Sequence, residues 1–204
     1  MYSSMRSRRE SYLPGFSART FSVSHGGDHT QGKRKSARPI DPKQALHVVL
    51  KASVARGALS MLHPKHCGPI HQFTHGLAQR WGIRLYRYAN VGNHIHLLIK
   101  VPSSAVWQRF LRELAGGIPL IVTGAKKGAP FAKSGKQRGF WDALAFTRIV
   151  RLGRDFEGMG RYLIKNLFEG AGIPVNQLLA QGARILSVGK VGFSSCGPPV
   201  IAIH

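Results

Sequence analysis

The chain has 204 residues, a length that fits one domain with tails and excludes a large multidomain assembly. Hydrophobic residues make up 43% of it and charged residues 19%, so the chain can bury a core. Thirty Lys and Arg side chains against eight Asp and Glu give a formal net charge of +22. A charge of this size attracts polyanions, and nucleic acid is the usual one.

The positive charge is spread over the whole chain, so it indicates a binding surface and not only a solubilising tail. Apolar runs are far shorter than the roughly 18 residues that a membrane-spanning helix needs. Two cysteines, Cys67 and Cys196, are too few for a disulfide framework. We therefore expect a cytoplasmic, nucleoid-associated protein without a membrane segment. Residues 1–38 are predicted to be a disordered basic arm, 39–171 the folded domain and 172–204 a Gly/Pro-rich tail.

The first half of the predicted domain contains a strand, a helix and a hairpin. The paired valines of Ala45–Lys51 predict a strand. After Pro69, apolar residues recur every four positions and predict a helix that ends at Gly82. Residues 83–90 and 94–101 flank a Val-Gly-Asn turn, which predicts a β-hairpin.

In the second half, Ser103 or Ser104 is predicted to cap a second helix that ends at Gly116-Gly117. A basic loop is predicted over 117–140, a strand over 140–151, a third helix over 154–170 and a short strand over 185–191. The order β-α-β-β-α-β followed by a helix predicts an α+β, ferredoxin-like split βαβ sheet with an additional C-terminal helix.

Two histidines in the predicted hairpin are candidate metal ligands. Alternate side chains of a strand share a face, so His94 and His96 would lie about 6–7 Å apart along the backbone on the same face. Two neutral imidazoles placed in this way can hold one divalent ion. A pair of surface or core histidines without a metal is the alternative.

The third predicted helix carries a candidate nucleophile. Tyr162 and Asn166 are four residues apart and therefore share a helical face. A tyrosine hydroxyl can attack a phosphodiester when a metal polarises the phosphoryl oxygens, and the Asn166 carbonyl could complete the metal shell. The alternative is that Tyr162 is a core aromatic residue.

Four motifs together resemble the HUH transposases that have one catalytic tyrosine, most closely their REP-associated branch. The resemblance extends from about residue 38 to 170. The motifs are His47-Val48-Val49-Leu50, the block Gly92 to Ile99, Phe140-Trp141 after the basic loop, and the pair Tyr162 and Asn166.

The resemblance implies a nuclease core in which His94, His96 and Asn166 bind Mg²⁺ or Mn²⁺. Tyr162 would attack single-stranded or hairpin DNA and leave a 5′-phosphotyrosine link and a free 3′-OH. His47 and Lys165 would line the site, although His47 could also be an ordinary packed histidine. A homodimer is one open assembly. Candidate phosphate contacts come from the acid-free loop: Lys126, Lys127, Lys133, Lys136 and Arg138.

A second group of potential metal ligands precedes and enters the first predicted helix. It comprises His63, His66, Cys67, His71 and His75. The spacing matches no common zinc pattern, so phosphate contacts or simple solvation compete with structural zinc.

An alternative function from another class is a noncatalytic module that binds single-stranded nucleic acid on the same fold. Such a module needs exposed aromatic residues on the sheet, where bases can stack. An enzyme instead needs Tyr162 and both histidines at one point.

Overall fold

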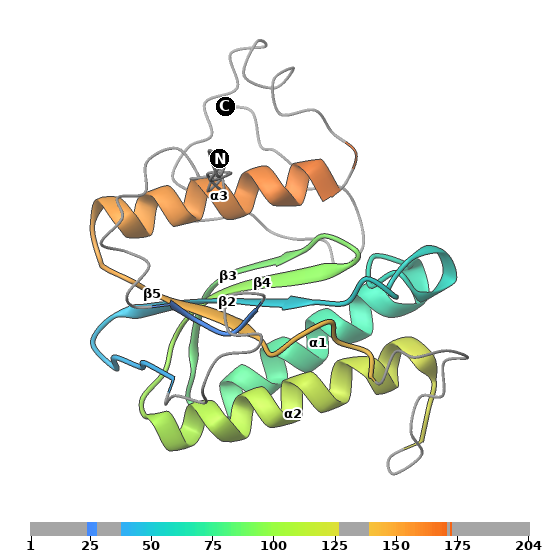
Figure 1. Ribbon diagram of the computed structural model, residues 1–204, viewed down its shortest axis with the longest axis horizontal. Coiled ribbons are helices and arrows are strands. Elements are labelled where there is room, and N and C mark those ends of the chain that lie inside the picture. Colours follow the sequence, from blue (N-terminus) through green and yellow to red (C-terminus); the bar gives the residue numbers. More distant parts are fainter. Residues whose placement is uncertain (1–23, 28–37, 127–138, 171, 173–204) are drawn as a thin grey trace, which may run out of the picture.

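A five-stranded antiparallel sheet lies between two layers of helices (Figure 1). This is a computed structural model, and it describes residues 24–27, 38–126, 139–170 and 172. The elements are β1 Ser24–His25, β2 Ala45–Lys51, a 3-10 helix Gly57–Leu59, α1 Pro64–Arg80, β3 Arg84–Asn90, β4 His94–Lys100, α2 Ser104–Thr123, β5 Phe146–Val150 and α3 Arg154–Gly170.

The strand order is β1-β5-β2-β4-β3. Without the two-residue edge strand β1, this is the sheet of the split βαβ plan, with β2 and β4 at its centre. Helices α1 and α2 cover one face, and among the described elements α3 covers the other (Figure 1). The predicted α+β, ferredoxin-like fold with an additional C-terminal helix is confirmed.

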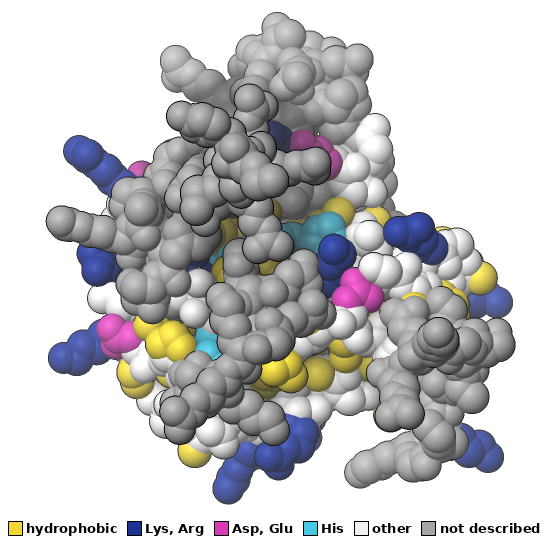
Figure 2. Space-filling model, viewed as in Figure 1, with side chains coloured by type: hydrophobic (Ala, Val, Ile, Leu, Met, Phe, Trp, Pro, Cys, Tyr) yellow, Lys and Arg dark blue, Asp and Glu magenta, His cyan; other side chains and the backbone are white. Residues whose placement is uncertain are grey.

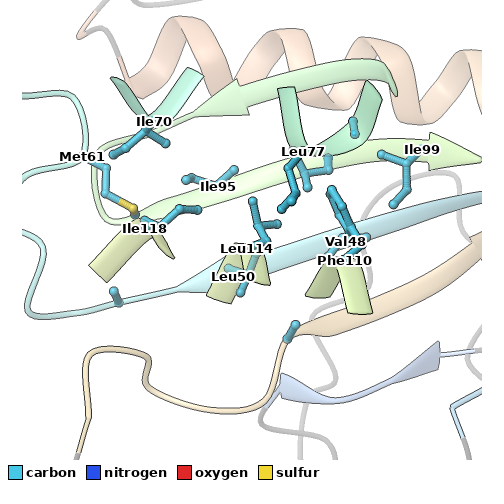
Figure 3. Close-up of a cluster of buried hydrophobic side chains, with 14 of the residues drawn as sticks. Val48, Leu50, Met61, Ile70, Leu77, Ile95, Ile99, Phe110, Leu114 and Ile118 are labelled. Atoms are coloured by element: carbon cyan, nitrogen blue, oxygen red, sulfur yellow. The ribbon is translucent and has the colours of Figure 1, made fainter. Parts of the chain in front are cut away.

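The main hydrophobic core lies between the sheet and the α1/α2 layer (Figure 3). Alternate residues of β2 and β4, such as Val48 and Leu97, are fully buried in it. Helix α2 contributes Trp107, Phe110 and Leu114. A smaller core under α3 contains Ala45, Leu98, Val150, Met159 and Leu163. Each central strand therefore has one fully apolar face, toward α1 and α2, and one face toward α3 that also carries polar residues.

Several predicted elements are confirmed. Strand β2 and helix α3 have the predicted bounds, and β3 and β4 form the predicted antiparallel hairpin. The structure also adds β1, which pairs with β5 and was not predicted. The strand predicted over 185–191 lies outside the described residues. None of the described helices is both long enough and apolar enough to cross a membrane.

Helix α1 begins at Pro64, so the predicted start after Pro69 is wrong. The His63 side chain accepts a hydrogen bond from the Lys65 N–H and caps the helix, and Pro64 occupies a first-turn position that proline tolerates. Pro69 costs one backbone hydrogen bond inside the helix. The adjacent Ile70, which is fully buried in the main core, helps to offset that cost.

Helix α2 continues to Thr123, so its predicted end at Gly116-Gly117 is wrong, and the loop begins later than predicted. Gly117 serves packing: a Cβ built there would lie 2.2 Å from Cζ of Phe73 on α1. Gly124, with a φ of 66°, is the residue that ends the helix in the left-handed conformation. The predicted cap at Ser103 is confirmed by its bond from the Val106 N–H.

The strand predicted over 140–151 is restricted to β5, because its first residues pack against other elements. Phe140 is buried in the main core, and the Trp141 indole N–H donates to the Ala115 carbonyl of α2 at 2.7 Å. Asp142 accepts hydrogen bonds from the backbone N–H and the hydroxyl of Ser53, at 2.8 and 2.6 Å. These contacts hold the segment at the end of β2 instead of in the sheet.

Two neighbouring glycines of α2 provide a test of this packing. Gly116→Ala should stabilise the protein by about 1 kcal/mol, because alanine favours a helix and a Cβ there meets nothing within 4 Å. Gly117→Ala should be less stable than Gly116→Ala by about 1–3 kcal/mol, since its methyl group overlaps the Phe73 ring. Urea unfolding measures both, and equal stabilities would contradict the α1–α2 contact.

Candidate active site

Three histidines and one tyrosine gather between the sheet and α3. His47 lies on β2, His94 and His96 lie on β4, and Tyr162 lies on α3. The register pairs Val49 with His96, so all three imidazoles project from the α3 side of the sheet. Figure 2 shows histidine side chains at the surface between α3 and the sheet, with Lys and Arg side chains beside them.

His47 and His96 form a buried hydrogen-bonded pair across the two central strands. Nε2 of His47 lies 3.1 Å from Nδ1 of His96. The two rings are parallel within 2°, and both residues are almost fully buried, with 4% and 3% of their surface exposed. His47 is therefore packed beside His96, and its role in lining a functional site stays a prediction.

Tyr162 packs edge-on against this pair. Its ring centroid lies 6.2 Å from that of His47 and 5.8 Å from that of His96, at angles of 87° and 85°. Met159 and Leu163 anchor α3 in the smaller core, which places the half-buried Tyr162 above the imidazoles. The structure thus brings Tyr162 and His96 together from elements far apart in the sequence.

His94 stands beside His96, with ring centroids 4.8 Å apart. Its Nδ1 lies 2.6 Å from Oδ1 of Asn93. A carbonyl oxygen only accepts, so Nδ1 of His94 carries the proton and its Nε2 is left with a lone pair. The shared face predicted for His94 and His96 is confirmed.

Burial keeps these imidazoles neutral. Desolvation, with smaller contributions from His47 and His94, lowers the pKa of His96 to about 2. Desolvation, followed by the nearby Arg148 guanidinium, lowers the pKa of His47 to about 3. The pKa of His94 is lowered by burial and then by Lys51. Neutral imidazoles are the form that binds metal ions.

The two histidines of β4 fit the requirements of a divalent cation. Nε2 of His96 is buried and has no hydrogen-bond partner among the described residues. In His94, the proton on Nδ1 likewise leaves Nε2 as an acceptor. Two neutral acceptor nitrogens on adjacent rings are suited to share one ion.

Asn166 lies one turn after Tyr162 in α3, as predicted. Its amide N–H donates to the Tyr162 backbone carbonyl at 2.8 Å, which is the hydrogen bond that the structure shows for this side chain. The amide oxygen is not used in that bond. A role for Asn166 as third ligand therefore stays a prediction.

An ion pair that the sequence analysis missed ties β5 to the start of α3. Arg148 donates to Asp155 at 2.5 Å, and the Arg148 side chain is 9% exposed. No local pattern pointed to it, because an arginine in a strand is normally solvent-facing. Its position helps to hold α3 against the sheet.

The remaining predicted binding residues fall in different places. Lys165 is exposed and lies 3.6 Å from Glu169 on the same helix. Lys126 is exposed just after α2. The other residues predicted to contact phosphates lie outside the described residues: Lys127, Lys133, Lys136 and Arg138.

The second group of potential ligands is divided between two places. His63 caps α1, and His66 Nδ1 lies 3.0 Å from the Ser60 carbonyl. His71 and His75 stack with centroids 4.1 Å apart, beside Tyr88. Throughout the described part of the chain, no three His, Cys, Asp or Glu side chains are arranged to hold a metal ion.

Comparisons with known proteins give a distant likeness to solved structures and none to families or curated proteins. No protein-family model matches the sequence, and no curated protein matches it. Among solved structures, a REP-associated tyrosine transposase bound to a REP hairpin is similar with a TM-score of 0.49 and 12% identity. The match covers 83% of this chain and 99% of that one. The likeness is distant and concerns the fold.

The buried imidazoles predict a pH-dependent stability. We expect the free energy of unfolding of the metal-free protein to fall as the pH is lowered from 7 to 5. An unfolded histidine binds a proton near pH 6.5, whereas His47 and His96 stay neutral down to about pH 3 and 2, so the unfolded state takes up more protons. Each contributes up to about 1.4 kcal/mol per pH unit.

Urea unfolding at a series of pH values in EDTA measures this slope. His47→Leu should reduce the slope, because it removes a histidine that takes up a proton between pH 7 and 5 only in the unfolded state. A wild-type stability that does not change between pH 7 and 5 would contradict the burial of the pair.

Proposed function

We propose that the chain is a metal-dependent endonuclease and strand transferase that acts on single-stranded or hairpin DNA, with Tyr162 as nucleophile. The observation that carries the proposal is the packing of the Tyr162 ring against His96, with centroids 5.8 Å apart. A candidate nucleophile and a candidate metal ligand thereby meet at one point. The motifs that resemble single-tyrosine HUH transposases support the same chemistry.

In the proposed reaction the phenolic oxygen of Tyr162 forms a bond to the scissile phosphorus. The bond from phosphorus to the 3′ oxygen breaks; the phenol releases its proton to solvent as it attacks, and the leaving 3′ oxygen takes up one proton from solvent to become a hydroxyl, so no net proton is lost or gained. The products are a 5′-phosphotyrosine link and a free 3′-OH. Phosphoryl transfer depends mainly on alignment and on stabilisation of charge.

His94 and His96 would hold the divalent ion, with the Asn166 amide oxygen as a third ligand. When bound, Mg²⁺ or Mn²⁺ polarises the phosphoryl oxygens and stabilises the negative charge that develops on them. The chain itself supplies neutral ring nitrogens and excludes water from the His47 and His96 side of the site. Mn²⁺ is the better experimental probe, because Mg²⁺ prefers oxygen ligands.

Positive charge supports a nucleic-acid substrate. The net charge of +22 favours association with phosphates at long range. Lys51 is exposed at the end of β2 and is paired in register with His94, so it offers a phosphate contact beside the proposed metal site. Lys165 offers another on α3, one turn from Tyr162. Such contacts would position DNA without reading its bases.

The alternative of a noncatalytic binding module has less support. Both faces of the sheet are covered by helices (Figure 1). Among the described residues, every Phe, Tyr and Trp side chain is buried or half-buried, so the sheet offers no open platform for stacked bases. DNA binding without any covalent product would nevertheless favour this alternative in the experiment below.

Tyr162→Phe should abolish the covalent protein–DNA adduct and leave hairpin binding nearly unchanged, because only the attacking oxygen is removed. The measurement is denaturing electrophoresis after incubation with labelled single-stranded hairpins and Mn²⁺. Tyr86→Phe is the matched control, since Tyr86 also packs in the smaller core, against Phe156. An adduct that persists in Tyr162→Phe would show that another residue is the nucleophile.

His94→Ala should remove DNA cleavage and the thermal stabilisation by Mn²⁺. At a concentration 100 times its Kd, a bound ion stabilises the folded state by about 2.7 kcal/mol, which a thermal-shift assay detects. His75→Ala, in the histidine pair of α1, is the control and should keep the full stabilisation. Stabilisation by Mn²⁺ that persists in His94→Ala and is lost in His75→Ala would place the metal site on α1.

A further inference from the structure

We propose that His47 is a positioning residue for His96. His47 accepts a hydrogen bond from Nδ1–H of His96 and thereby keeps Nε2 of His96 as an acceptor nitrogen. The proposal deepens the proposed function. It rests on that function in one respect, namely that Nε2 of His96 binds the divalent ion. His47 itself would touch neither metal nor DNA.

The first argument concerns the single proton between the two rings. Nε2 of His47 and Nδ1 of His96 face each other at 3.1 Å, and in a hydrogen bond only one of them carries hydrogen. If His47 were the donor, the proton of neutral His96 would sit on Nε2. That nitrogen is buried without a partner among the described residues, and a buried donor without an acceptor is costly. The other assignment leaves a lone pair there, which a cation can use.

The second argument concerns the rigidity of the pair. His47 and His96 lie on the two central strands, whose pairing runs from Leu46 with Ile99 to Lys51 with His94. The His47 ring is also packed edge-on by Phe146 at 6.3 Å and by Tyr162 at 6.2 Å. His47 is only 4% exposed, so its ring has no room to turn away from His96.

The third argument is that both proposed ligands are oriented in the same way. Asn93 holds Nδ1 of His94, and His47 holds Nδ1 of His96. In each imidazole Nδ1 thus donates a hydrogen bond, and Nε2 keeps a lone pair that can bind a cation. A hydrogen-bond partner on the second ring nitrogen is the usual means by which proteins orient metal-binding histidines and select their tautomer.

The tautomer can be tested without any metal or DNA. The ¹⁵N chemical shifts of the His96 ring in the metal-free protein report which nitrogen carries the proton. We expect the proton on Nδ1 in the wild type, a mixture of tautomers in His47→Leu, and return to Nδ1 in His47→Gln, whose amide oxygen can accept. A wild-type His96 with the proton on Nε2 overturns the proposal. This measurement uses only the wild-type protein, so it does not depend on whether the His47 variants fold.

Mn²⁺ affinity, measured by titration calorimetry, tests the consequence. His47→Leu should bind Mn²⁺ about 10–100-fold more weakly than the wild type, and His47→Gln should recover most of the loss. His75→Ala is the control, because it removes a histidine of α1 and leaves the contact between His47 and His96 intact. Equal affinities of His47→Leu and the wild type overturn the proposal.

The two proposals fail in distinguishable ways. A wild type that binds no Mn²⁺ overturns the proposed metal-dependent function, while the ¹⁵N spectrum still decides whether His47 sets the His96 tautomer. If the His96 tautomer and Mn²⁺ binding are as expected but Tyr162→Phe still forms the adduct, only the assignment of Tyr162 as nucleophile is overturned.

Discussion

The pairing of β2 with β4 at the centre of the sheet is the constraint on which the site depends. Because side chains alternate along a strand, this register sends Val48 and Leu97 into the main core and His47 and His96 toward α3. A slip of one residue would exchange the two sets. Each fully buried aliphatic side chain of this kind stabilises the fold by about 1.5–3 kcal/mol, so the core enforces the register and the register places the imidazoles.

Helix α3 completes the site because it is held at several points. Met159 and Leu163 bury its apolar face, and the ion pair of Arg148 with Asp155 fastens its first turn to β5. Tyr162 is carried on this face and rests on the imidazole pair. The polar residues below it are tolerated because neutral, hydrogen-bonded histidines are far less costly to bury than charged ones.

The proposed chemistry of the site and the proposed attraction of DNA would be carried by different residues. The imidazoles are neutral and mostly buried, so the net charge of +22 resides on lysines and arginines elsewhere. Interactions between exposed charges are screened over about 10 Å at 0.1 M salt. If the proposed DNA binding holds, salt should therefore weaken it while leaving the geometry of the histidines and Tyr162 intact.

Local periodicity in the sequence determined β2, the β3–β4 hairpin, α3 and the face shared by His94 and His96, because each depends only on neighbours along the chain. Contacts between distant segments were decided by tertiary structure. Helix α2 continues through Gly117, where Phe73 packs closely against the helix. Phe140 lies outside the sheet because its side chain is buried in the main core. Likewise, His47 contacts His96 only because of the register between β2 and β4. That register depends on how apolar faces far apart in the sequence pack together, and no local pattern encodes it.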